Sequence, residues 1–93
     1  MNKRKTMSAI IIDVREPYEF SAGHAKGALN IPPAELIQGI PPALKNTPKD
    51  TTLVLYCRSG SRSNTSMHIL RGYGFTDLVN GINQHQVEAN YLQ

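Results

Sequence analysis

The chain of 93 residues has no tryptophan, only one cysteine and no long apolar run. A single cysteine excludes a disulfide within the chain, so the fold depends on its hydrophobic core. No segment approaches the roughly 18 apolar residues of a membrane span, and we expect no membrane partner. The lone thiol favours the cytoplasm, where cysteines stay reduced. The alternative is a periplasmic protein that has lost a signal peptide, because Lys3, Arg4 and Lys5 resemble the start of one.

The charge of the chain is concentrated at its start. The chain carries a net charge of +3, and without the cluster at residues 3–5 its seven remaining basic residues equal its seven acidic residues. We interpret residues 1–8 as a basic tail and residues 9–93 as one domain, the number that this length favours. A nucleic-acid surface needs a basic stripe with interleaved aromatic side chains, which this balanced body does not offer. No nucleic-acid partner is expected.

Short apolar runs alternate with segments of helical spacing along the chain. Strands are predicted at 9–13, 28–31, 52–56 and 75–79, and helical segments at 16–20, 34–40, 62–72 and 82–92. Asn80-Gly81 is predicted to be a turn. This alternation favours an α/β fold, with a mostly parallel sheet flanked by helices on both faces. Ligands of such folds bind beyond the carboxyl ends of the strands, where Asp13, Arg15 and Cys57 lie.

The only cysteine, Cys57, directly follows the clearest strand. After it come Arg58, Ser59, Gly60, Ser61 and Arg62. A sharp turn from a strand into a helix directs several backbone N–H groups and the positive end of the helix dipole to one point, which favours an anion. The same donors and the two guanidinium groups favour thiolate over thiol. The segment is therefore predicted to be both a nucleophile and an anion-binding loop, and a buried structural cysteine is the alternative.

The spacing of the loop separates two chemistries. Four residues stand between Cys57 and Arg62. Cysteine phosphatases have one residue more, which makes room for a tetrahedral phosphoryl group. The tighter loop suits a smaller guest, such as the outer sulfur of a persulfide. A small phosphatase or arsenate reductase is therefore a less favoured enzyme.

Four stretches of the chain form a recognisable series: DVREPYEF at 13–20, GHAKGALNIP at 23–32, YCRSGSRS at 56–63 and LRGYGF at 70–75. In this order they resemble the single-domain rhodaneses, a family of sulfurtransferases. The resemblance extends from about residue 10 to about residue 82. It implies the small rhodanese-like α/β fold.

The resemblance also implies sulfur transfer in two half-reactions. The Cys57 thiolate takes the outer sulfur of thiosulfate or of a persulfide donor and then passes it to cyanide or to a thiol acceptor. A sulfur-carrier protein is a further candidate acceptor. The loop residues 58–62 bind the substrate in this scheme, and neither a cofactor nor a metal is needed. A rhodanese-like module that only binds a partner is the alternative, and the intact cysteine and arginines argue against it.

Two charged residues outside the loop are interpreted as structural support. Asp13 and Arg15 end the first strand, and a carboxylate close to Cys57 would oppose thiolate formation. Arg15 and Glu19 stand four apart in a helical turn and are predicted to form an ion pair.

The C-terminal part departs from the pattern of many relatives, which carry two glycines and, shortly after them, a tryptophan. The corresponding stretch here is NGINQH at 80–85. We expect altered packing at this edge and retained chemistry. His68 and His85 have no histidine or cysteine at ligand spacing, so no metal site is expected.

Overall fold

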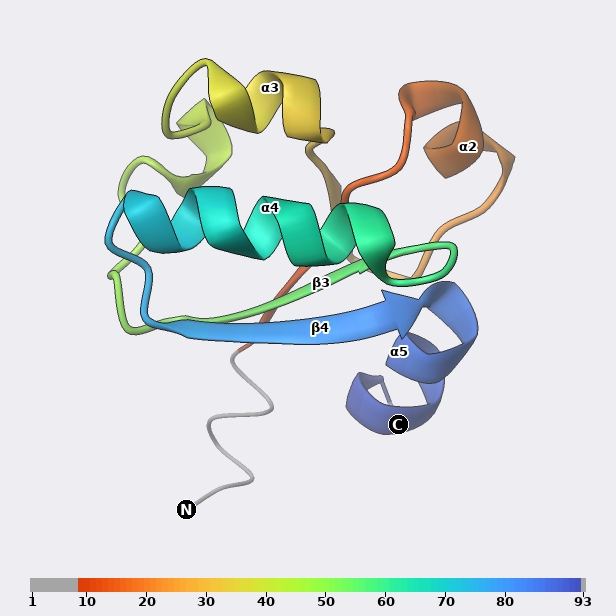
Figure 1. The fold of residues 1–93 in the computed structure, drawn as a ribbon. Coiled ribbons are helices and arrows are strands. Elements are labelled where there is room, and N and C mark those ends of the chain that lie inside the picture. The colour runs from red at the N-terminus through yellow and green to blue at the C-terminus, as the bar shows by residue number, and fades with distance from the viewer. Residues whose placement is uncertain (1–8, 93) are drawn as a thin grey trace.

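The computed structural model describes residues 9–92, and the tail predicted at residues 1–8 lies outside them. Four parallel strands form one sheet in the order β2-β1-β3-β4 (Figure 1). The strands are β1 (Ile10–Asp13), β2 (Leu29–Asn30), β3 (Thr52–Cys57) and β4 (Asp77–Asn83). The helices are α2 (Pro17–Ala22), α3 (Pro33–Ile37), α4 (Ser61–Gly72) and α5 (Gln84–Tyr91), with a 3-10 helix η1 at Pro42–Leu44. The α/β fold expected from the sequence is confirmed.

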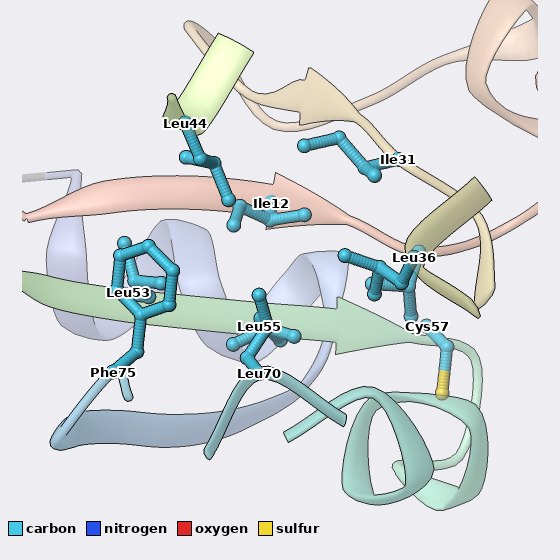
Figure 2. Close-up of a cluster of buried hydrophobic side chains, with 10 residues drawn as sticks. Ile12, Ile31, Leu36, Leu44, Leu53, Leu55, Cys57, Leu70 and Phe75 are labelled. Atoms are coloured by element: carbon cyan, nitrogen blue, oxygen red, sulfur yellow. The ribbon is translucent and has the colours of Figure 1, made fainter. Parts of the chain in front are cut away.

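The side chains of β3 alternate between two hydrophobic clusters, as the two-residue period of a strand requires. Leu53, Leu55 and Cys57 belong to the cluster that packs against α3 and α4. Figure 2 shows this cluster, with the three side chains projecting from one strand. Val54 and Tyr56 belong to the second cluster, on the side of α5. Helices therefore cover both faces of the sheet, and β3 separates the cysteine from its neighbouring tyrosine.

The central strands form the most buried part of the molecule. Ile12 of β1 and the leucines of β3 have no exposed surface. Each such side chain stabilises the fold by about 1.5–3 kcal/mol relative to an exposed one. The carboxyl ends of β1 and β3 pair side by side, with Asp13 opposite Tyr56. The cysteine loop thus starts from the most buried part of the sheet.

The prediction of a turn at Asn80-Gly81 is wrong, because β4 continues through these residues. Leu55 pairs with Asn80 and Tyr56 with Ile82, so Gly81 is the extra residue of a β-bulge. Ile82 follows at a φ of 75°, a left-handed conformation that is uncommon for a β-branched residue. Asn-Gly pairs suit tight turns and bulges alike, and the pairing with β3 decides between the two.

All four helices differ from their predicted bounds by one to three residues, and two of the differences have a clear local reason. The segment at 34–40 ends early as a helix, since α3 stops at Ile37 and Gly39 has a φ of 139°. The last helix begins at Gln84 because the Asn83 side-chain oxygen accepts a hydrogen bond from the Gln86 N–H at 2.8 Å. Of the helices within residues 9–92, none has the length and apolar content needed to cross a membrane.

Candidate active site

Cys57 is the last residue of β3, whereas the predicted strand ended at residue 56 and placed the cysteine just beyond it. Its side chain is buried, with 2% of the residue exposed. The Gly60 N–H donates to the Cys57 Sγ at 3.1 Å, and the Ser63 Oγ lies 3.6 Å from the same sulfur. Gly60 has a φ of 96°, which lets the chain turn tightly before α4 begins at Ser61. Figure 2 shows the sulfur directed away from the strand, toward the segment where α4 starts.

Two opposing effects determine the acidity of the Cys57 thiol. Burial raises its pKa, because a thiolate is poorly solvated inside the protein. The Ser63 backbone and hydroxyl, together with the Ser59 and Gly60 N–H groups, outweigh burial and lower the pKa to about 7. A free cysteine has a pKa of about 8.5, so far more of this thiol is ionised at neutral pH.

The two arginines of the loop share one carboxylate, Glu19 of α2. Arg62 donates from Nη1 to Glu19 Oε1 at 2.7 Å and from Nη2 to Glu19 Oε2 at 3.2 Å. Arg58 lies farther away, with 3.9 Å between its Nη1 and Glu19 Oε2, and its side chain is 75% exposed. The hydrogen bonds from Arg62 and from the Glu16 backbone lower the pKa of Glu19 to about 2. The carboxylate stays ionised and holds Arg62 beside the loop.

The predicted ion pair between Arg15 and Glu19 is wrong. Arg15 instead pairs with Asp13, with 2.7 Å between its Nη2 and Asp13 Oδ2. The same nitrogen donates to the Gly23 carbonyl at 2.7 Å. The helical spacing of Arg15 and Glu19 is not used because Arg15 precedes α2 and each residue has a closer partner.

Asp13 and Arg15 belong to a buried network on the other face of the sheet from the cysteine. The Tyr56 hydroxyl donates to Asp13 Oδ2 at 2.8 Å and accepts from the Ala25 N–H at 2.9 Å. Burial and the bond to Asp13 raise the pKa of Tyr56 to about 12. The Arg15 guanidinium also lies 5.5 Å from the centre of the Tyr56 ring. The network ties β1, β3 and the segment after α2 together behind the cysteine.

The structure adds a residue of β4 to the site, Asn80, which sequence reasoning assigned to a turn. Its Nδ2 donates to the Gly60 carbonyl at 2.9 Å, and its Oδ1 accepts from the Ser63 hydroxyl at 2.7 Å. The only signal in the sequence was the departure from the two glycines of many relatives. Of the predicted loop residues, Ser59 and Ser61 are exposed, whereas Gly60 is buried against Asn80 and Ile82.

A surface hollow of about 310 Å³ lies away from the cysteine loop, at the end of α3. It is lined by Glu35, Gln38, Gly39, Ile40, Pro41 and Pro42. None of these residues is a cysteine, serine or threonine. The loop at the end of β3 is therefore the candidate active site.

The chain matches the model of one protein family. The Rhodanese-like domain matches residues 1–85. This range includes the whole sheet and the cysteine loop.

Several curated proteins are similar to the chain. YqhL of Bacillus subtilis, named as an uncharacterized protein, is 42% identical over 73 residues, which are 77% of this chain and 54% of YqhL. Thiosulfate sulfurtransferase PspE of Escherichia coli is 36% identical over 69 residues, 74% of this chain and 64% of PspE. MoeZ of Mycobacterium tuberculosis, a probable adenylyltransferase/sulfurtransferase, is 39% identical over 74% of this chain and 17% of MoeZ. The chain thus spans less than two thirds of the length of these relatives.

Solved structures share the fold. A rhodanese with anions from E. coli has a TM-score of 0.72 and 32% identity, and the match covers 84% of this chain and 89% of the other. A human single-domain sulfurtransferase, TSTD1, has a TM-score of 0.71 and 29% identity, with coverage of 87% and 82%.

Proposed function

The chain belongs to the rhodanese-like domain family, and on this basis we propose that it moves sulfane sulfur from thiosulfate or a persulfide donor to a thiol or cyanide through a persulfide on Cys57. Relatives named as sulfurtransferases support this class of reaction. The proposal assigns catalysis to Cys57 and substrate binding to the loop at residues 58–62. Asp13 and Arg15 support the loop from the opposite face of the sheet.

One observation carries the proposal: the sulfur of Cys57 accepts the Gly60 N–H at 3.1 Å where a strand turns into a helix. A thiol used only for packing needs no such donor. The donor favours the thiolate, which is the nucleophilic form. It also offers a preformed hydrogen bond to the anion that develops when the sulfur is transferred.

In the first half-reaction, the Cys57 thiolate attacks the outer sulfur of thiosulfate. A bond forms between the cysteine sulfur and this outer sulfur, while the bond from the outer sulfur to the sulfonate group breaks. Sulfite leaves with the bonding electron pair, and the negative charge of the enzyme moves to the outer sulfur of the persulfide. Arg58 and Arg62 attract the anionic donor and stabilise the leaving sulfite.

In the second half-reaction, an acceptor attacks the outer sulfur of the persulfide. Cyanide becomes thiocyanate, or an acceptor thiolate becomes a persulfide, and the electron pair of the broken bond returns to Cys57 as the thiolate. Arg58 is 75% exposed at the rim of the loop and can contact either kind of acceptor. A sulfur-carrier protein is a further acceptor that we propose, in line with the likeness to MoeZ. The compartment that we propose is the cytoplasm.

The experiment compares intact mass before and after incubation with thiosulfate, for the native protein and for Cys57→Ser. Because Cys57 is the only cysteine, any gain in mass is assigned to it without digestion. We expect the native protein alone to gain one sulfur atom. Addition of cyanide should then remove the sulfur and produce thiocyanate in equal amount.

The control is alkylation of the thiol by iodoacetamide, which shows that the cysteine is reduced and reachable. A protein that alkylates but gains no sulfur from thiosulfate or from glutathione persulfide contradicts the proposed function. That result would favour a module that binds a partner without catalysis.

A further inference from the structure

The hydroxyl of Ser63 has one hydrogen and several acceptors around it. Its Oγ lies 2.7 Å from Asn80 Oδ1, 3.1 Å from the Gly60 carbonyl oxygen and 3.6 Å from the Cys57 Sγ. A hydroxyl donates only one strong hydrogen bond at a time. The thiolate of Cys57 and the amide oxygen of Asn80 are therefore rivals for the same hydrogen, with the Gly60 carbonyl oxygen as a further acceptor.

The β-bulge of β4 determines which end of the Asn80 amide faces Ser63. The Ile82 N–H donates to Asn80 Oδ1 at 3.0 Å, and Asn80 Nδ2 donates to the Gly60 carbonyl at 2.9 Å. Exchanging the oxygen and nitrogen would set two donors against each other at Ile82 and two acceptors at Gly60. Oδ1 therefore faces the Ser63 hydroxyl as an acceptor.

We propose that Asn80 is a positioning residue for Cys57, because its side-chain oxygen competes with the thiolate for the hydroxyl hydrogen of Ser63. While Cys57 is a thiol, Ser63 donates to Asn80 and the S–H faces the Ser63 oxygen. When Cys57 ionises, Ser63 turns its hydrogen to the sulfur, and Asn80 Oδ1 keeps only the Ile82 N–H.

The consequence for sulfur transfer depends on the function proposed above. In the persulfide, the negative charge lies on the outer sulfur and no longer on the cysteine Sγ. The Ser63 hydroxyl is then free to return to Asn80. The competition for the hydrogen thus destabilises the thiolate of the unloaded enzyme but not the persulfide. It therefore makes transfer of sulfur to Cys57 more favourable relative to ionisation of the thiol alone.

Other charged groups near Cys57 do not take part in this exchange. Arg58 and Arg62 stand on the loop and at the start of α4, and Glu19 of α2 lies behind them. The contacts from β4 come from the uncharged residues Asn80 and Ile82. Asp13, Arg15 and Tyr56 face the opposite side of the sheet. These charges are the same in every variant of the test, so they cancel in the comparison.

The test is a double-mutant cycle on the ionisation of Cys57, which is measured by thiolate absorbance and by the pH dependence of alkylation. Neither measurement needs a sulfur donor, so its outcome is independent of the proposed function. Asn80→Ala should lower the pH midpoint by about half a unit to one unit, the size of one neutral hydrogen bond. Ser63→Ala should raise the midpoint. In the Ser63→Ala background, Asn80→Ala should cause no shift.

A role of Asn80 in merely holding the loop predicts a different pattern. Loosening the loop would raise the midpoint in Asn80→Ala, and the shift would be the same with and without the Ser63 hydroxyl. Either result overturns the proposal.

A measurement on the native protein keeps the test independent of how well the variants fold. The NMR chemical shifts of the Ile82 amide and of the Asn80 side-chain amide should change with pH, with the same midpoint as the ionisation of Cys57. The reason is that Asn80 Oδ1 loses the hydrogen bond from Ser63 when the thiolate forms. If both signals stay constant while the thiol ionises, the hydroxyl does not move and the proposal is wrong.

Discussion

The carboxylate of Glu19 and the guanidinium of Arg62 form two hydrogen bonds between residues that stand 43 positions apart in the chain. Glu19 comes from α2, and the N–H of Glu16, the residue just before this helix, donates to the same carboxylate at 2.9 Å. The pair joins the first helix to the cysteine loop. It also neutralises part of the positive charge that an anionic donor would meet.

Replacing Glu19→Gln should improve binding of thiosulfate. The glutamine oxygen can still accept from Arg62, but the negative charge that repels the donor is lost. We expect the KM for thiosulfate to fall by roughly threefold, because a partly exposed charge contributes less than about 1 kcal/mol. Thiocyanate formation at varied thiosulfate measures it. Glu35→Gln makes the same change of net charge on α3, and an equal effect there would contradict a local role for Glu19.

The Glu19–Arg62 pair should also stabilise the fold in a pH-dependent way. The pKa of Glu19 is lowered from an ordinary value near 4.5 to about 2 in the folded state. Its contribution is therefore fully present above about pH 4.5 and is lost as the pH falls toward about 2. Urea unfolding of the native protein and of Glu19→Gln should show a gap that narrows over this range. If the difference in the free energy of unfolding between the two proteins does not change with pH, the contribution of Glu19 comes from packing and not from its charge.

Loading of sulfur onto Cys57 should follow the ionisation of its thiol. The loop donors lower the pKa of Cys57 to about 7, so the rate should rise with pH and level off above this value. The same shift stabilises the fold at alkaline pH, and this contribution is lost as the pH falls through about 7. Single-turnover loading with thiosulfate measures the profile. A midpoint near 8.5, the value of a free cysteine, would show that the loop donors do not act on the thiolate.

Tyr56→Phe should destabilise the fold without removing the nucleophile. The change leaves the Ala25 N–H and Asp13 Oδ2 without the hydroxyl that bonds both. The cost is expected to be about 1–3 kcal/mol in the free energy of unfolding, because the groups are buried. Tyr18→Phe is the matched control, since Tyr18 is 76% exposed and should change stability little. Equal losses in both variants would contradict a structural role for the network.

Gly81→Ala should disturb the bulge that directs Asn80 to the loop. An added Cβ would lie 2.6 Å from the Val87 Cγ2 and 3.1 Å from the Leu55 carbonyl oxygen. We expect a loss of about 1–3 kcal/mol in stability, as overpacking of a core usually causes. Gly72→Ala is the control at the end of α4, where a Cβ meets nothing within 4 Å. Thermal unfolding compares the two, and a neutral Gly81→Ala would show that β4 can shift to accept the methyl group.

The centre of the fold was predictable because its two middle strands are short apolar runs, which are buried in most folds. The runs at 9–13 and 52–56 became β1 and β3, which lie side by side at the centre of the sheet. The position of Cys57 at the end of a strand followed from the same pattern. The local rules that apply to such segments do not depend on which distant residues cover them.

The errors concern residues for which a partner other than the expected one is closer in space. Arg15 and Glu19 have a spacing typical of a helical ion pair, but Asp13 and Arg62 lie closer to them. Asn80-Gly81 has the composition of a turn, but the pairing with β3 makes it a bulge. The spacing of two residues shows that they could form a contact, but it does not show which other group competes for that contact.

The local pattern of the chain was enough to predict an α/β fold with a cysteine where a strand meets a helix, because burial and chain direction act over a few residues. The tertiary structure alone placed Glu19 on Arg62 and Asn80 on Ser63. Both contacts join elements that pack together only when the sheet is complete, so no short stretch of sequence contains the information that selects them.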